Sequence, residues 1–384
     1  MSCTKHIIFV AIAFTLTACQ NVQTQFSLEE TILPVNLDHR LNDRTSTKYS
    51  KNGLPPISIY TNRQARVAAD LNGDGYVDWF YATDSGSSDR GGRFVIYYGS
   101  ESGRFEDRLL TGSKGCIYPS KPVVNDFNGD DKPDIFVSCS GWDQEPFPGE
   151  PSKVVLSGPE NTYSVETAIA SNDYRHGATS ADFDGDGYAD VLVTEGAYNR
   201  GKKSLRLQVY FGNGRGEFPR NETLELPQTP KFGYMYASVE AVDANRDGHF
   251  DLAIGGNEWS GEGHFTGTKT KLFFNKAING FKPSDPLLIP PVKHHGMVLD
   301  FDTGLEGGDP AIFILRTGDG SADSSFYKGF YIQSVNLKTK KSKALAQNPR
   351  MTFIYWLKAW TVDGVQYVGS DDRFDPRLDP IVVK

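Results

Sequence analysis

Short apolar stretches alternate with turn-forming residues along most of this chain. Four of them read WFYA at 79–82, IFVS at 135–138, VLVT at 191–194 and LAIG at 252–255. A second apolar segment precedes each one: VAA at 67–69, VV at 123–124, ATSA at 178–181 and VEAV at 239–242. Apolar runs of this length, bounded by turn residues, are typical of short buried strands. The pattern therefore predicts an all-β protein built from strand pairs.

An acidic, nine-residue loop separates the two segments of each pair. The copies read DLNGDGYVD at 70–78, DFNGDDKPD at 126–134, DFDGDGYAD at 182–190 and DANRDGHFD at 243–251. Their first aspartates lie 56, 56 and 61 residues apart. A nearly constant period of this size is typical of solenoids, propellers and arrays.

Oxygen-bearing residues recur at fixed positions of these loops. Asp or Asn occupies positions 1, 3, 5 and 9, and the carbonyl of position 7 is a natural fifth ligand. Hard oxygen ligands on one short loop favour Ca²⁺, whereas the absence of Cys and His side chains at those four positions disfavours zinc and copper. We therefore expect up to four Ca²⁺ ions, with these ligands: Asp70, Asn72, Asp74, Tyr76 and Asp78; Asp126, Asn128, Asp130, Lys132 and Asp134; Asp182, Asp184, Asp186, Tyr188 and Asp190; Asp243, Asn245, Asp247, His249 and Asp251.

Two other interpretations of the loops are weaker. An EF-hand needs a bidentate Glu at position 12 and a helix on each side, but position 12 is apolar or aromatic here: Tyr81, Val137, Val193 and Ile254. An acidic turn without metal could explain one copy. It explains four copies in register poorly.

The repeats resemble a known family. The strand–loop–strand pattern is followed by turns such as VYFGNGRGEF at 209–218, YYGSESGRF at 97–105 and LFFNKAINGF at 272–281. Together these segments, over about residues 60–340, resemble the FG-GAP or VCBS repeats of integrin-like β-propellers. The resemblance implies four-stranded antiparallel blades with calcium held between the first and second strands. It implies no single activity, because members serve adhesion, lectin-like binding, scaffolding and occasionally polysaccharide cleavage.

The number of blades follows less directly from the pattern. A fifth unit at 296–315 has Asp300 on period and also keeps Asp302, but its ligand spacing is broken, so we expect a blade without calcium there. A sixth begins at FIYWLKAW (353–360) and is incomplete, and ISIY at 57–60 could supply a missing strand. We expect six blades, with seven as the alternative.

The first twenty residues indicate where the protein resides. Lys5 precedes the apolar stretch IIFVAIAFTL, which is too short for a membrane-spanning helix and has the length of a signal peptide. The stretch leads into Leu16-Thr17-Ala18-Cys19, which resembles the bacterial lipobox. We therefore expect a signal peptide at 1–18, a lipid-anchored tether at 19–50 beginning with lipidated Cys19, and the propeller domain at 51–384. Gln20 resembles the sorting signal for the outer membrane, so a lipid anchor in the cell envelope is expected; an ordinary secreted protein is the alternative.

Composition fits a secreted repeat protein. The chain has 384 residues, with 39 Gly and 21 Pro, and a formal net charge of −8. The predicted ligand positions account for much of this acidity, so the charge gives no support to nucleic-acid binding. Cys116 and Cys139 bracket the second loop. Either a disulfide, which an oxidising compartment permits, or two buried thiols is compatible with their positions.

Aromatic and polar residues gather in the connections that should lie opposite the calcium loops. A convergent set of such residues is the default ligand-site hypothesis, here for a glycan or an envelope protein, and packing between blades is the alternative. The candidates are Trp142, Tyr174, Arg175, His176, Tyr198, Trp259, His294 and His295. There is no G-x-S-x-G, H-E-x-x-H or P-loop motif. We expect a binding or scaffolding module; the alternative is a carbohydrate-active enzyme, lyase-like, with Tyr and His in an axial pocket.

Overall fold

The computed structural model describes residues 64–84, 86–102, 105–111, 114–199, 202–229, 236, 238–256, 268–320, 329–348, 356–370 and 380–384. The predicted signal peptide, tether, Cys19, ISIY segment and Trp259 lie outside these residues. Regular structure in the described part is β throughout, apart from one 3-10 turn at Pro159–Asn161. No helix in that part is long and apolar enough to cross a membrane.

The strands of the first half form two antiparallel sheets. Sheet 1 has the order β1-β2-β3-β4, and sheet 2 joins seven strands in the order β11-β10-β9-β8-β7-β6-β5. The strands of sheet 1 are β1 (Gln64–Ala69), β2 (Asp78–Thr83), β3 (Phe94–Tyr98) and β4 (Glu106–Leu109). The strands of sheet 2 are β5 (Pro119–Asn125), β6 (Asp134–Cys139), β7 (Glu150–Ser157), β8 (Tyr163–Ala181), β9 (Asp190–Asn199), β10 (Lys202–Phe211) and β11 (Arg220–Thr223).

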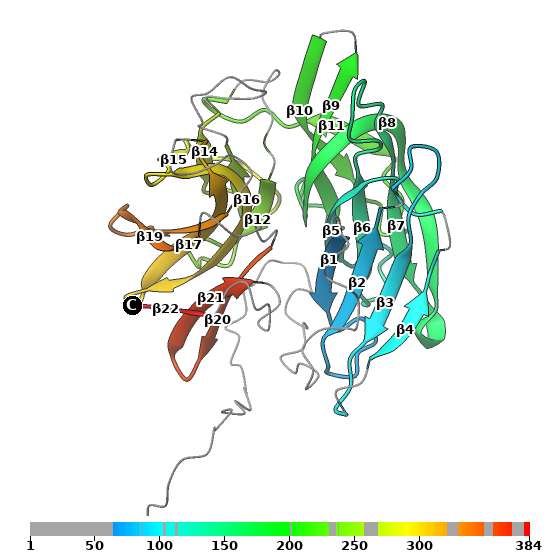
Figure 1. Cartoon of the computed structure of the whole chain (residues 1–384), viewed down its shortest axis with the longest axis horizontal. Helices are drawn as coiled ribbons and strands as arrows, with labels where there is room; N and C mark the ends of the chain where they lie inside the picture. Colours follow the sequence, from blue (N-terminus) through cyan, green and yellow to red (C-terminus); the bar gives the residue numbers. More distant parts are fainter. Residues whose placement is uncertain are drawn as a thin grey trace, which may run out of the picture.

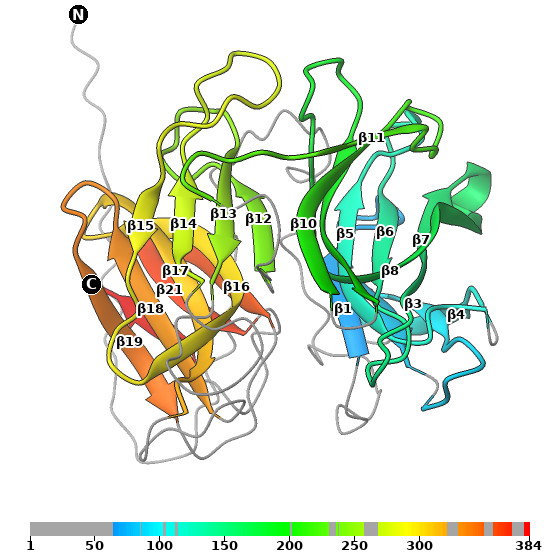
Figure 2. The ribbon, with the colours of Figure 1, turned by 90° about the horizontal axis from the view of Figure 1, so that it is seen from above.

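The second half forms three antiparallel sheets, and each keeps its strands in chain order. Sheet 3 contains β12 (Ser238–Val242), β13 (Asp251–Gly255), β14 (Thr270–Phe273) and β15 (Leu287–Ile289). Sheet 4 contains β16 (His295–Glu306), β17 (Asp309–Gly318), β18 (Phe330–Asn336) and β19 (Ser342–Asn348). Sheet 5 contains β20 (Leu357–Val362), β21 (Val365–Ser370) and β22 (Ile381–Val383). Figures 1 and 2 place β1–β11 on one side of the molecule and β12–β22 on the other.

One strand, β8, belongs to two four-stranded units. Its first part, from Tyr163, pairs with β7, and its last part, from Tyr174 to Ala181, pairs with β9. Register shifts interrupt both pairings near the middle of the strand, between Thr167 and Ala178, where β8 bends from one unit into the next. Sheet 2 is therefore two antiparallel units that share a continuous 19-residue strand, a junction that the repeat pattern did not predict.

Apolar side chains fill the space between consecutive units. One core joins sheet 1 to β5–β7, a second joins β6–β8 to β8–β10, and a third joins β8–β10 to sheet 3. Two more join sheet 3 to sheet 4 and sheet 4 to sheet 5. Strands such as β6 and β13 are buried at every position, because neighbours cover both faces of their sheet. The all-β, antiparallel prediction is confirmed.

The first strands of the successive units lie side by side. β1 contacts β5, β5 contacts β8, β8 contacts β12, β12 contacts β16, and β16 contacts β20. Side chains on these strands can therefore meet although their residues are more than a hundred positions apart in the chain.

The fifth repeat differs from the expected strand–loop–strand pattern. Asp300 and Asp302 lie within β16, paired with Leu315 and Phe313, and the hairpin turns later at Gly307 and Gly308. Both glycines have positive φ, which glycine adopts at little cost. Without the ligand spacing of the other loops, the chain simply continues as a strand, and its carboxylates accept hydrogen bonds from the β20 amides of Leu357 and Ala359 at 2.8 and 2.7 Å.

Candidate metal loops and the opposite end of the sheets

The four acidic loops occupy equivalent places in the fold. They join β1 to β2, β5 to β6, β8 to β9, and β12 to β13. In each case the position 1 aspartate directly follows the first strand and the position 9 aspartate begins the second. The ligand residues of one loop are thus held between two paired strands.

The position 1 carboxylate shapes each loop through backbone amides. In the first loop, Asp70 accepts hydrogen bonds from Gly73, Asp74 and Gly75 at 2.8, 3.1 and 2.9 Å. Asp126 and Asp182 accept the corresponding three bonds, and two of them are present at Asp243. Gly73 and Gly75 have φ of 77° and 87°, so the chain can curl around this carboxylate.

The position 9 carboxylate ties the loop to the third strand of its own unit. Asp78 accepts a bond from Leu71 at 2.8 Å and another from Gly99, just after β3, at 2.8 Å. The equivalent outer partners are Ser157 at 2.6 Å, Gly212 at 2.9 Å and Asn275 at 2.8 Å, bonded to Asp134, Asp190 and Asp251 respectively. All four position 9 residues are fully buried. This bracing role was not predicted from the sequence.

Burial is the largest influence on the pKa of the position 9 aspartates and of three position 1 aspartates. It raises the pKa of Asp78, Asp134, Asp190 and Asp251 to about 7 in each case, although backbone hydrogen bonds lower it. Neighbouring loop carboxylates raise the pKa further at Asp78, Asp190 and Asp251. Burial also raises the pKa of the position 1 residues Asp70, Asp182 and Asp243.

The third loop brings three of its carboxylates together. Within the part of the chain that the structure describes, Asp182, Asp184 and Asp190 each place an oxygen within 4.8 Å of the others. Two oxygens that ligate one Ca²⁺ at about 2.4 Å can be at most about 4.8 Å apart. The donor set, made only of oxygen, and its spacing both fit this ion.

The neighbouring unit closes over three of the loops. Gly216, in the turn after β10, donates its amide to the carbonyl of Phe127 at 2.7 Å, and Phe281, after β14, donates to Phe183 at 2.9 Å. At the first loop a side chain makes this link, since the Tyr163 hydroxyl donates to the carbonyl of Leu71 at 2.8 Å. Each of these loops is therefore packed between two units.

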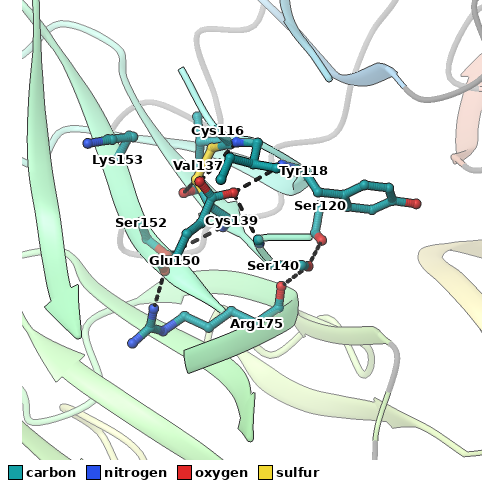
Figure 3. Close-up of a disulfide and its surroundings, with 12 residues drawn as sticks. Cys116, Tyr118, Ser120, Val137, Cys139, Ser140, Glu150, Ser152, Lys153 and Arg175 are labelled. Carbon is teal, nitrogen blue, oxygen red and sulfur yellow. Dashed lines mark hydrogen bonds between the residues drawn. A yellow bond between two sulfur atoms is a disulfide. The ribbon is translucent and has the colours of Figure 1, made fainter. Parts of the chain in front are cut away.

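At the other end of the strands, a disulfide and a buried carboxylate organise one connection (Figure 3). Cys116 and Cys139 are bonded, with their Cα atoms 5.6 Å apart. Beside them, the Glu150 carboxylate accepts bonds from the amides of Ile117, Tyr118 and Gly141 at 2.9, 3.0 and 3.0 Å. Burial raises the pKa of Glu150, and these three bonds oppose the change. The carboxylate thus joins the segment before β5 to the loop after β6.

Arg175, a ligand candidate from the sequence, lies inside the protein. Its side chain is fully buried, and its Nε donates to Glu195 at 3.0 Å. Its Nη1 donates to the carbonyl of Glu150 at 3.1 Å, and its Nη2 donates to the Ser171 hydroxyl at 2.6 Å. Tyr210 donates a further bond to Glu195 at 2.5 Å. Arg175 thereby joins both units that share β8, which is a structural role.

Tyr174, His176 and Trp142 lie around the loop between β6 and β7. The Tyr174 hydroxyl donates to Asp143 at 2.9 Å, and the Phe147 ring meets the Tyr174 ring edge-on at 5.6 Å. The rings of Tyr174 and His176 are 6.5 Å apart. Tyr174 is buried beneath the loop, whereas Trp142 and His176 are half-buried.

The remaining candidates lie elsewhere. His294 and His295 are at the start of β16, where the Nδ1 atom of His294 lies 3.9 Å from Asp319. His295 is buried against Tyr331, with ring centroids 5.1 Å apart. Tyr198 belongs to β9, but its side chain is outside the described set, as is Trp259.

A charged cluster that the sequence did not reveal lies on the first strands. Lys121 of β5 forms ion pairs with Glu240 of β12 and, at 3.0 Å, with Asp300 of β16. Its ammonium also lies 4.7 Å from the centroid of the Trp356 ring. The three charged side chains are 18%, 15% and 6% exposed. The cluster connects the two sides of the molecule seen in Figure 1.

Comparison with known proteins supports the repeats. The family model for the FG-GAP-like repeat matches residues 70–137 and 182–254, so the chain carries FG-GAP-like repeats at these two places. None of the curated proteins matches the chain.

Solved structures share only a distant likeness. A fungal alcohol oxidase in complex with copper is 10% identical, with a TM-score of 0.43, covering 84% of this chain and 76% of its own. The periplasmic gluconolactonase PpgL of Pseudomonas aeruginosa is 12% identical, also with a TM-score of 0.43, covering 80% and 82%. Similarity at this level supports no conclusion about fold or activity.

Proposed function

We propose that this protein is a calcium-stabilised β-propeller lipoprotein that acts as a binding or scaffolding module in the cell envelope. The observation that carries the proposal is the set of four acidic loops, each held at the same junction between the first and second strands. Their donor atoms are oxygens, and each position 1 carboxylate accepts hydrogen bonds from backbone amides of its own loop, which curls the chain around it. That arrangement suits a closed structural Ca²⁺ site.

The packing of the units supports a propeller of six blades. Five cores join consecutive units, and the first strands contact one another from β1 through to β20. When the shared strand β8 is divided at its bend, the described strands form six units, the last with three strands. A closed ring removes exposed sheet edges. A fourth strand from residues 57–60 would complete the sixth blade.

Calcium binding can be tested by titration and melting. Isothermal titration of metal-depleted protein should give up to four sites, with dissociation constants of about 10⁻⁴–10⁻³ M, as in other extracellular modules. Chelation should lower the Tm, because an ion that binds only the folded state stabilises it by mass action. An unchanged Tm after removal of verified bound calcium would refute a stabilising role.

The lipid anchor and the ligand surface belong to the same proposal. Acylation at Cys19 would hold the domain at the membrane, and Cys19→Ala should abolish labelling by a radioactive fatty acid while leaving the β-sheet circular dichroism unchanged. Equal labelling of both proteins would exclude the lipobox. For the ligand, Trp142 is the best placed residue, because the loop carrying it is fixed on both sides by Glu150 and Tyr174. A glycan or an envelope protein would bind there.

A further inference from the structure

The third acidic loop differs from the other three in charge. It has Asp184 at position 3, where the others have Asn72, Asn128 and Asn245. Its four ligand side chains are therefore all carboxylates, one negative charge more than in each of the other loops. A cation near Asp184 would bring the net charge of this loop back to that of the other three ligand sets.

Such a cation is present on the fourth strand of the same unit. Arg220 of β11 forms an ion pair with the Oδ2 atom of Asp184 through its Nη2 atom. Its Nη1 atom donates to Glu222 at 2.9 Å, and its guanidinium carbon lies 3.5 Å from the centroid of the Phe211 ring. The side chain is thus held in place from two directions while 49% of it stays exposed.

Asparagines of two other loops make a hydrogen bond that the third loop cannot make. In the first and fourth loops the Asn side-chain amide donates to the position 5 carboxylate, Asp74 or Asp247, at 3.1 and 2.9 Å. A carboxylate has no proton to donate, so Asp184 cannot make this bond to Asp186. Arg220 does not replace that bond; it brings a donor and a positive charge to Asp184 itself from outside the loop.

The same position in the other repeats carries no arginine. Counting two residues past the aromatic residue that closes each turn gives Arg220 in the third repeat. The equivalents in the first, second and fourth repeats are Asp107, Val165 and Pro283. Asp184 and Arg220 therefore occur together as a matched pair in one repeat of the four.

We propose that Arg220 sets the calcium affinity of the third loop by competing with the ion for the carboxylate of Asp184. The inference rests on the proposed function, that these loops bind calcium. The guanidinium and Ca²⁺ are both attracted to the carboxylate of Asp184, and like charges repel, so the ion binds more weakly while the arginine is present. Because the pair is partly exposed, Arg220 can move to solvent at modest cost. Without it, the loop with the most negative ligand set becomes the tightest site.

The test is a metal titration of the full chain in which only one loop is observed. Tb³⁺ is the probe, excited through the position 7 tyrosine of the loop. A Tyr76→Phe/Tyr163→Phe background removes the position 7 tyrosine of the first loop and the tyrosine whose hydroxyl contacts Leu71. It leaves the signal of Tyr188, which is 47% exposed. Calcium affinity is then read from the displacement of Tb³⁺ by Ca²⁺.

Three variants are compared in this background, and Arg220→Lys serves as a fourth. Arg220→Gln should bind Ca²⁺ at the third loop about tenfold more tightly, equivalent to about 1.4 kcal/mol, and the gain should shrink at high salt because partly exposed charges are screened. The double variant Asp184→Asn/Arg220→Gln should return to the unmodified affinity. Lys341→Gln, which removes an exposed charge between β18 and β19, should change nothing.

The outcomes separate this inference from the proposed function. If Arg220→Gln binds Ca²⁺ equally or more weakly while the unmodified loop binds well, the competition is refuted and the calcium site stands. If no variant displaces Tb³⁺ with Ca²⁺, the calcium proposal itself fails. Arg220→Lys keeps the charge, so an affinity close to wild type would show that the positive charge at position 220, and not another contact of the arginine, lowers the affinity.

Discussion

The Lys121 cluster predicts a large loss of stability from one methionine. Lys121→Met keeps the length of the side chain and removes its charge, leaving Glu240 and Asp300 close together between the strands. Removing one member of a buried ion pair costs about 3–5 kcal/mol, because the remaining charge is left uncompensated. The cluster is 6–18% exposed, so water screens it in part and we expect about 3 kcal/mol.

The loss should depend on pH. The pKa of Glu240 is raised to about 8. Burial is the main cause and Asp300 adds to it, whereas Lys121 opposes both. Burial lowers the pKa of Lys121, but the two carboxylates outweigh this and raise it above the usual range. Without the lysine, the pKa of Glu240 rises further. A carboxyl whose pKa is raised in the folded state stabilises below its unfolded pKa of 4.5 and loses that contribution as pH rises. The variant should therefore be least stable, relative to wild type, above pH 8.

Urea denaturation at pH 5.5 and pH 8.5, followed by tryptophan fluorescence, measures both effects. The triple variant Lys121→Met/Glu240→Gln/Asp300→Asn should recover most of the loss, since replacing all charged partners leaves no uncompensated charge. Lys153→Met is the matched control, because the hydrogen bond of that lysine to Thr167, at 3.1 Å, is exposed to solvent; its effect should stay within about 0.5 kcal/mol. A change as small as this in Lys121→Met at both pH values would refute the reasoning.

Two further predictions concern residues at the opposite end of the sheets. Burial, with Arg316 nearby, lowers the pKa of His295 to about 3, so between pH 7.5 and pH 5 the unfolded chain binds a proton that the folded state does not. Over this range the free energy of unfolding of wild type should fall by about 2 kcal/mol more than that of His295→Gln. Parallel pH profiles in urea denaturation would contradict this. Trp142→Ala should cost less than about 0.5 kcal/mol of folding free energy but about 1–3 kcal/mol of ligand affinity. Trp79→Ala, at a fully buried position, should instead cost about 3–5 kcal/mol of stability, and an equally large loss in Trp142→Ala would show that Trp142 is a packing residue.

Local pattern was enough to predict the strands and the loops. The apolar runs at 135–138 and 252–255 became the buried strands β6 and β13, and every acidic loop lies between two paired strands. These features depend on residues a few positions apart, where period and turn chemistry act directly. The hairpin between β20 and β21 is equally local, since it turns at Asp363 and Gly364, and both residues have positive φ.

Long-range partners could not be predicted in this way. Lys121 and Asp300 are 179 residues apart, and nothing in either sequence neighbourhood indicates that the first strands meet. Arg175 looked like a surface residue beside Tyr174 and His176, but its neighbours on β7 and β9 bury it. Asp300 kept the repeat period, yet the period alone does not make a loop when Gly304 and Gly308 stand where the other loops have the aspartates of positions 5 and 9.

The acidic loops combine two roles, and this has a consequence for calcium. The position 9 aspartate braces its own third strand, while the next unit donates a hydrogen bond to the position 2 carbonyl at three of the loops. An ion bound to one loop would therefore stabilise contacts in two units, and its loss would weaken both. Because consecutive units also share their cores, calcium removal should destabilise neighbouring units together, as nearest-neighbour coupling does in repeat proteins. The ion-binding repeats would then act as a linked series, so the weakest loop limits the stability of the units beside it.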